Sequence, residues 1–141
     1  MAEDVRGLTI GSEITFEKQI TEELVAGFVQ VSGDTNPLHS DPAYAARTRF
    51  KRPIAHGMIS AGFISAALAT KLAPRNVVVY LSQSLQFRAP VYIGDTLTVT
   101  CTVKAVDPAR SRATVETIVA NQDGTQVIRG EAGVLVEALE D

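Results

Sequence analysis

The segment of residues 57–70, GMISAGFISAALAT, limits the possible folds of this chain more than any other part, because it contains no charged residue. Small residues alternate in it with Met, Ile, Phe and Leu, so a helix over this segment has apolar side chains on every side. Such a helix has no face suited to water, and we expect it to be buried on all sides. It is shorter than the roughly 20 residues that span a bilayer, so protein must supply the covering atoms.

The residues after Pro74 follow a period of two, which is typical of half-buried strands. In residues 96–105 one face carries Leu97, Val99, Cys101, Val103 and Ala105, and the other carries threonines and Lys104. Further strands are predicted over residues 77–87, 112–121 and 127–139, and a hairpin turn at residues 121–124 joins the last two. One apolar helix followed by antiparallel strands predicts a single α+β domain over residues 1–141, with the sheet curled around a long central helix.

A second helix is expected over residues 22–32, since Thr21 is a good N-cap and Gly33 provides a stop. Residues 33–42, GDTNPLHSDP, favour turns, so their polar side chains project from a loop. An exposed cluster of cations follows at Arg47, Arg49, Lys51 and Arg52. These cations could bind the phosphates of a coenzyme, although a run of charges is more often a solvated face.

Charge and cysteine content exclude some classes of protein. The formal net charge is −3 and the pI is near 5.4, with no long basic face, so we expect small ligands and no nucleic acid. The one cysteine, Cys101, cannot form an internal disulfide, and its place in a predicted strand favours a core thiol. The first residues contain no apolar stretch suited to a signal peptide, so we expect a cytoplasmic protein without membrane association.

Asp34 and His39 lie five residues apart in the predicted loop. Adding water to a conjugated thioester needs a base for the attacking water and an acid for Cα, and a carboxylate beside an imidazole can supply both. Pro37 stiffens the loop and could hold the two groups toward one point. Alternatively, Asp34 only caps a turn and His39 is an ordinary loop histidine. With Asp41 and His56 they could also bind a metal, but the spacing matches no strong motif and we predict no metal.

Gly57 and His56 lie where the apolar helix is expected to begin, and there backbone N–H groups are unpaired and carry partial positive charge. A glycine allows a ligand carbonyl to approach closely, so the Gly57 N–H could stabilise a developing oxyanion. The alternative is that Gly57 only relieves crowding at the helix start. For His56 we favour a structural role as a satisfied, partly buried histidine.

Residues 28–46, FVQVSGDTNPLHSDPAYAA, closely resemble the motif of R-specific enoyl-CoA hydratases and MaoC-like dehydratases. The core of that motif, S-G-D-x-N-P-L-H, is intact as Ser32, Gly33, Asp34, Asn36, Pro37, Leu38 and His39. Residues 47–58, RTRFKRPIAHGM, also resemble this family, and residues 81–95, LSQSLQFRAPVYIGD, extend the similarity over nearly the whole chain. Together, the motifs in residues 28–46 and 47–58 are highly specific for this family.

The resemblance implies a hot-dog fold and a homodimer whose substrate tunnel lies near the subunit interface. The implied reaction is the reversible, R-specific syn hydration of trans-2-enoyl-CoA to (R)-3-hydroxyacyl-CoA, as used in fatty acid metabolism and polyhydroxyalkanoate synthesis. It needs no cofactor, because coenzyme A arrives as part of the substrate. Two alternatives are a hot-dog acyl-CoA thioesterase and a non-catalytic subunit that binds acyl thioesters.

The resemblance also assigns roles to individual residues. Asp34 and His39 would be the catalytic pair. Asn36 would orient these two side chains without touching the substrate, and His56 would also support them without touching the substrate. Gly57 would bind the thioester carbonyl, and Ser65 would support the substrate from within the helix. The coenzyme A phosphates would lie near Arg47, Arg49, Lys51 and Arg52.

Overall fold

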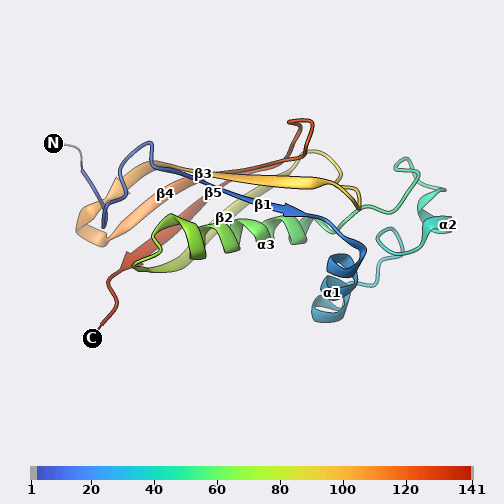
Figure 1. The fold of residues 1–141 in the computed structure, drawn as a ribbon, viewed down its shortest axis with the longest axis horizontal. Coiled ribbons are helices and arrows are strands. Elements are labelled where there is room, and N and C mark those ends of the chain that lie inside the picture. The colour runs from blue at the N-terminus through green and yellow to red at the C-terminus, as the bar shows by residue number, and fades with distance from the viewer. Residues whose placement is uncertain (1–2, 141) are drawn as a thin grey trace.

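Five antiparallel strands form one sheet that curves around a helix in the computed structural model, which describes residues 3–140 (Figure 1). The order across the sheet is β1-β3-β4-β5-β2. The strands are β1 Glu13–Gln19, β2 Val77–Phe87, β3 Thr96–Asp107, β4 Arg112–Ala120 and β5 Gln126–Glu137. The helices are α1 Glu22–Ser32, α2 Pro42–Ala45 and α3 Gly57–Ala67, followed by a π-helical turn at Leu68–Leu72 and, before β4, a 3₁₀ turn at Pro108–Arg110. This is the α+β arrangement expected from the sequence.

Helix α3 packs against the sheet through Ile59, Ile64 and Ala67, which belong to the hydrophobic core (Figure 1). The expectation that this helix is buried on all sides is wrong for the single chain. Met58 is 54% exposed and Gly62 is exposed as well, because the sheet covers only one side of the helix. Within residues 3–140, no helix is both long enough and apolar enough to cross a membrane.

Strands β2, β4 and β5 agree with the predicted ranges to within two residues. The hairpin turn between β4 and β5 is also confirmed, because the Gly124 N–H donates to the carbonyl of Asn121 over 3.0 Å. Gly124 has a φ of +79°, in the left-handed region that glycine adopts without a steric penalty.

In strand β3 the predicted alternation holds from Leu97 to Val103, and Cys101 is a buried free thiol. Ala105 was assigned to the buried face, but it is exposed. A register shift between Val103 and Ala105 inserts a β-bulge, after which Val106 is the residue that packs against the core. A bulge reverses the sense of alternation beyond it, and this accounts for the error.

The N-terminal part contains one predicted and one unpredicted element. Helix α1 begins and ends as expected, with the Leu24 N–H donating to Thr21 Oγ1 over 3.1 Å and Gly33 adopting a φ of +77°. Strand β1 was not predicted; it pairs with β3 and packs Ile14 and Phe16 against the core. Helices α1 and α2 and the start of α3 lie at one end of the sheet, where they gather the polar loop residues (Figure 1).

Candidate active site

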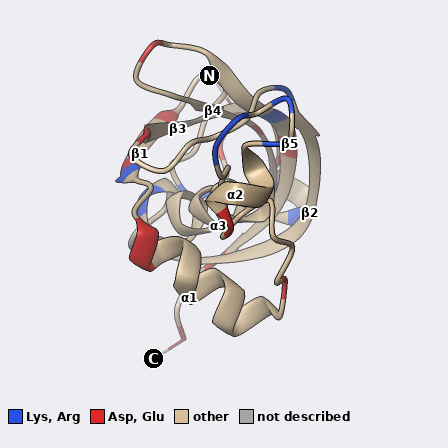
Figure 2. Cartoon of the chain, turned by 90° about the vertical axis from the view of Figure 1, so that its right-hand side faces the viewer, with Lys and Arg blue, Asp and Glu red and all other residues tan. Residues whose placement is uncertain are grey.

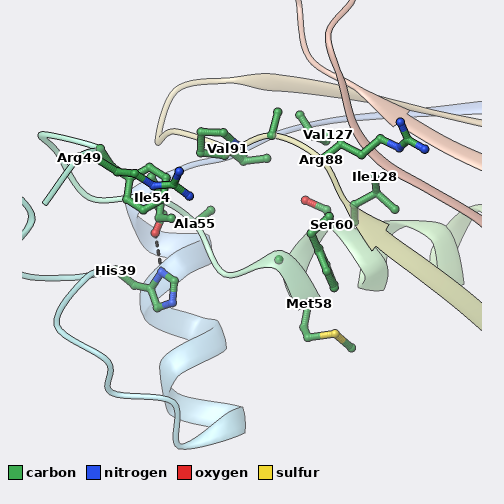
Figure 3. A pocket seen from close by; sticks show the side chains of 15 residues that line it. His39, Arg49, Ile54, Ala55, Met58, Ser60, Arg88, Val91, Val127 and Ile128 are labelled. Carbon is green, nitrogen blue, oxygen red and sulfur yellow. Dashed lines mark hydrogen bonds between the residues drawn. The ribbon is translucent and has the colours of Figure 1, made fainter.

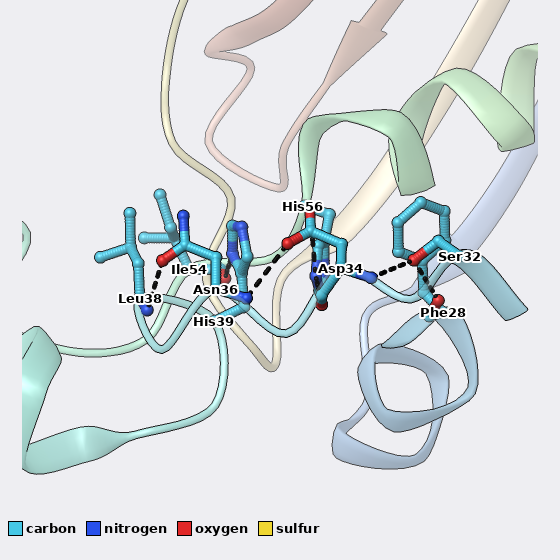
Figure 4. A network of polar contacts seen from close by, with 8 residues as sticks. All are labelled: Phe28, Ser32, Asp34, Asn36, Leu38, His39, Ile54 and His56. Atoms are coloured by element: carbon cyan, nitrogen blue, oxygen red, sulfur yellow. Dashed lines mark hydrogen bonds and ion pairs between the residues drawn. The ribbon is translucent and has the colours of Figure 1, made fainter. Parts of the chain in front are cut away.

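The loop between α1 and α2 is shaped by its own side chains (Figure 4). Asp34 Oδ1 accepts the N–H of Asn36 over 3.1 Å, and Asn36 Oδ1 accepts the N–H of Leu38 over 3.0 Å. The Asn36 carbonyl in turn accepts the N–H of His39 over 3.0 Å. Asp and Asn commonly stabilise turns in this way. Asn36 therefore orients the Asp34 carboxylate through its backbone N–H, and it shapes the loop through its side-chain oxygen.

His39 is held in one tautomer by a backbone carbonyl. Its Nδ1 lies 2.6 Å from the carbonyl oxygen of Ile54, and that oxygen can only accept a hydrogen bond (Figures 3 and 4). Nδ1 must therefore carry the proton, and Nε2 keeps a free lone pair. This arrangement gives the neutral imidazole a basic nitrogen on the side away from Ile54.

His56 stacks on His39, with 3.7 Å between the ring centroids. It is only 2% exposed, and its Nε2 lies 3.2 Å from the backbone carbonyl of Asp34, so Nε2 carries the proton. Burial lowers the pKa of His56, and at neutral pH its 3.9 Å contact with the Asp34 carboxylate is therefore not an ion pair. The expectation of a satisfied, partly buried histidine is wrong on both points. The ring is fully buried, and its Nδ1 has no hydrogen-bond partner among residues 3–140.

The structure brings Asp34, His39 and His56 together, with one side-chain oxygen or nitrogen of each within 4.8 Å of the others. The Asp34 side chain is 47% exposed, so water can reach it. The two imidazole rings stack at an interplanar angle of 29°. Asp41 lies outside the cluster and caps α2 by accepting the N–H groups of Ala43 and Tyr44. A carboxylate and imidazoles this close together can carry out acid–base chemistry.

Helix α3 begins at Gly57, beside a cavity of about 470 Å³ (Figure 3). His39 and Ser60 also line this cavity, and Arg49 and Arg88 contribute cations to its wall. The His56 side chain makes no capping hydrogen bond at this helix start, so it does not compete for the first N–H groups. A Cβ atom at Gly57 would lie 2.6 Å from Phe87 Cε1, so a larger residue here would displace the Phe87 ring at this wall of the cavity.

Ser65 lies elsewhere, in a second cavity of about 660 Å³ that is lined by Phe28, Tyr80 and Leu81 among others. Ser65 and Gly57 line different cavities, and they are eight positions apart, a rise of about 12 Å along a helix. Met58 borders both cavities. The role of Ser65 in binding substrate stays a prediction.

The four predicted cations, which we call the basic loop (Arg47, Arg49, Lys51 and Arg52), are exposed as expected. Figure 2 looks onto this end of the molecule. Arg49 lies over the Phe50 ring at 4.7 Å and Arg52 over the Tyr92 ring at 4.0 Å, which restricts both guanidinium groups. Of the basic loop, only Arg49 lines the first cavity.

Two polar residues of the first cavity, Arg88 and Ser60, were not predicted from the sequence as site residues. Arg88 follows the last residue of β2, and no sequence pattern places the end of this strand beside the basic loop. Ser60 follows Gly57 by one helical turn, a spacing that puts both residues on one face of the helix. This three-residue spacing is the sequence signal that could have predicted Ser60 as a neighbour of Gly57 in the site.

Residues 7–135 match the protein family described as "MaoC like domain". An (R)-specific enoyl-CoA hydratase from Rhodospirillum rubrum is 47% identical over 91% of this chain and 88% of its own length. A protein of the same description from Aeromonas caviae is 40% identical over 92% of this chain and 96% of its own. A 3-hydroxybutyryl-CoA dehydratase from Methylorubrum extorquens is 42% identical over 95% and 84% of the two chains.

Solved structures agree with these sequence relatives. An R-hydratase from Pseudomonas aeruginosa in the unliganded form superposes with a TM-score of 0.86 and 43% identity, over 94% of this chain and 84% of that one. The (R)-hydratase from Aeromonas caviae involved in polyhydroxyalkanoate biosynthesis gives a TM-score of 0.87 and 40% identity, over 92% and 97%. The expected hot-dog fold is thereby confirmed.

Proposed function

This chain belongs to the MaoC-like domain family, and from that premise we propose that it is an R-specific enoyl-CoA hydratase that uses Asp34 and His39. The enzyme is a hydro-lyase that interconverts trans-2-enoyl-CoA and (R)-3-hydroxyacyl-CoA. One observation carries the assignment of the two residues. The Ile54 carbonyl fixes the proton on His39 Nδ1, and this leaves a free Nε2 lone pair on a ring that lies close to the accessible Asp34 carboxylate.

The reaction requires one proton to leave water and one proton to reach Cα. With a water molecule held between Asp34 and His39, the water oxygen bonds to Cβ while one proton passes to the pair. The π electrons of the double bond move onto the thioester oxygen, and the pair then returns a proton to Cα. The catalytic groups end in their starting state, and coenzyme A, as part of the substrate, is the only other group required.

The negative charge that develops on the thioester oxygen needs a donor. Gly57 is suited to this role, because it is the first residue of α3 and lines the same cavity as His39. A helix start supplies unpaired N–H groups and the positive end of the helix dipole. Such preorganised donors favour the enolate-like transition state over the ground state.

The two cavities suit the two halves of an acyl-CoA. The first cavity is bordered by Arg49 and Arg88, so it suits the coenzyme half with its phosphates. The second cavity is lined mainly by apolar side chains, with Ser65 among its few polar groups, so it suits the acyl chain. Met58, at the border of both, would lie next to the thioester. With the substrate divided in this way, the reacting bond would lie at the start of α3.

The same surface supports a homodimer. The uncovered side of α3 exposes Met58 and Gly62, and the neighbouring edge strand β2 exposes Tyr80 and Leu81. A second copy would bury these residues and close the second cavity, which its own chain leaves open. Light scattering should give twice the 15.1 kDa mass of one chain, whereas a fully active monomer would contradict the proposal.

The stereochemistry of hydration tests the proposed pair. Asp34 and His39 come from one loop, so they deliver hydroxyl and proton to the same face of the planar enoyl group. Crotonyl-CoA hydrated in heavy water should give R-3-hydroxybutyryl-CoA with deuterium at C2 in the syn position. Chiral chromatography and proton NMR read both centres. An S alcohol or an anti label would contradict the proposed roles of Asp34 and His39.

A further inference from the structure

Ser60 carries a buried hydroxyl that the protein does not satisfy. The residue is 1% exposed, and its Oγ has no hydrogen-bond partner among residues 3–140. Burying a hydroxyl without a partner costs stability, so such a group is rarely kept without a use. The proposed mechanism assigns it none.

Two other helical hydroxyls, those of Ser32 and Thr70, are satisfied in the ordinary way. Ser32 donates to the carbonyl of Phe28 over 2.6 Å, and Thr70 donates to the carbonyl of Ala66 over 2.7 Å. Both bonds run to the residue four positions earlier, the usual partner for Ser and Thr in helices. Ser60 makes no such bond to His56, whose carbonyl accepts the N–H of Ile59 instead.

The position of Ser60 directs its hydroxyl toward the proposed reaction centre. It lies one turn after Gly57 on α3, and side chains on a helix lean toward the N-terminus. Ser60, Gly57 and His39 line the same cavity, and Figure 3 shows the Ser60 hydroxyl pointing into it. A ligand oxygen held by the first N–H groups of α3 would therefore lie on the side that Ser60 faces.

We propose that the Ser60 hydroxyl donates a second hydrogen bond to the thioester oxygen, beside the one from the Gly57 N–H. The inference rests on the proposed function and deepens it. As water adds to Cβ and the π electrons move onto the thioester oxygen, the hydroxyl keeps its own proton and stabilises the negative charge. The partner that the fold does not provide for Ser60 Oγ is thus provided by the substrate, most strongly in the transition state.

Kinetics of a Ser60→Ala variant test the proposal. Hydration of crotonyl-CoA should lose about 10- to 10²-fold in turnover number, because a donor to a developing oxyanion acts mainly on the chemical step. The Michaelis constant should change little, since the ground-state carbonyl is a weaker acceptor. The melting midpoint should equal or exceed that of the parent, because the lost hydroxyl had no partner in the fold. An unchanged turnover number, or a loss that follows a lower melting midpoint, would overturn the proposal.

A spectroscopic measurement separates this inference from the proposed function, since it requires binding alone. A donor to the carbonyl of a conjugated thioester moves its absorption band to longer wavelength. Bound 2,4-hexadienoyl-CoA should therefore show a smaller shift in Asp34→Asn/Ser60→Ala than in Asp34→Asn. An equal shift in both proteins would overturn the role of Ser60, whereas absence of hydration by the parent chain would overturn the proposed function.

Thr70→Val is the matched control. Thr70 is exposed in the π-helical turn that continues α3, and its hydroxyl already has a partner in the carbonyl of Ala66. Removing that hydroxyl should leave turnover and spectrum at the parent values. A loss in Thr70→Val equal to that in Ser60→Ala would show that hydroxyl removal acts through the helix as a whole and would overturn the proposal.

Discussion

Replacement of Gly57 by alanine separates the catalytic use of the α3 start from its part in folding. A Cβ at this position would lie 2.6 Å from Cε1 and 2.7 Å from Cδ1 of Phe87, well inside contact distance. Phe87 is 55% exposed, so its ring can rotate away without displacing the backbone. The new methyl group and the displaced ring would both crowd the cavity wall through which the Gly57 N–H reaches a substrate oxygen.

The expected effect of Gly57→Ala on stability is much smaller than its expected effect on the hydration rate. Because the ring can move and alanine favours a helix, the free energy of unfolding should change by no more than about 1 kcal/mol. Loss of an oxyanion donor typically costs roughly 10²–10³-fold in rate, which is about 2.7–4 kcal/mol in the barrier. Turnover should therefore fall far more than stability does.

The assay compares crotonyl-CoA hydration, followed by loss of the enoyl absorbance, with urea unfolding of the same preparations. Gly27→Ala is the control, because it makes the same change in the middle of α1, where a Cβ would meet open space. That variant should keep full turnover and gain about 0.5–1 kcal/mol of stability. A folded Gly57→Ala protein with parental turnover would refute the assignment of the Gly57 N–H.

Three further predictions concern the groups around the cavity. Asp34→Asn and His39→Ala should each lower the hydration rate by roughly 10²–10⁴-fold while the protein stays folded, as steady-state kinetics and circular dichroism can measure. Replacing the four cations of the basic loop by glutamine should raise the Michaelis constant for crotonyl-CoA more than it lowers turnover, and added salt should reduce the difference between variant and parent. Burial lowers the pKa of folded His56 below 6.5, so stability present above pH 6.5 should be lost as the pH falls through the lower folded pKa. Urea unfolding at several pH values should show a shallower loss for His56→Gln.

Each of these predictions has a contrary outcome. Near-normal turnover by Asp34→Asn or His39→Ala would remove that residue from the mechanism. An unchanged Michaelis constant with an unchanged salt dependence would make the basic loop only a solvated face. A stability loss in acid that is equally steep in parent and His56→Gln would show that other groups titrate there.

Local signals made much of the fold predictable. The Thr21 cap and Gly33 stop define α1, the period of two defines most of β3, and runs of strand-favouring residues define β2, β4 and β5. In each case the deciding residues are neighbours in the sequence. Strand β1 has only Ile14 and Phe16 as apolar positions between charged residues, and its pairing with β3 involves residues far away in the chain. The bulge at Ala105 likewise depends on the partner strand.

In the candidate site, too, some features depend on neighbouring residues in the sequence and others depend on the fold. The turn-forming side chains of Asp34 and Asn36 shape their own loop, so the proximity of Asp34 and His39 could be expected from sequence. The tautomer of His39 depends on Ile54, which the fold brings in from fifteen positions away. Arg88 enters the cavity from the end of β2, and no local pattern marks it.

The buried polar atoms without a hydrogen-bond partner mark the part of the fold where stability is reduced in favour of function. Among residues 3–140, the buried side-chain atoms without a hydrogen-bond partner are His56 Nδ1 and Ser60 Oγ, and both lie around the start of α3. Each such group costs about 1–3 kcal/mol, which is large against a typical total stability of roughly 5–15 kcal/mol. The remainder of α3 packs into the core through Ile59, Ile64 and Ala67, and this burial can offset the cost. One apolar helix thus anchors the core along its length and leaves its first turn free to bind a substrate oxygen.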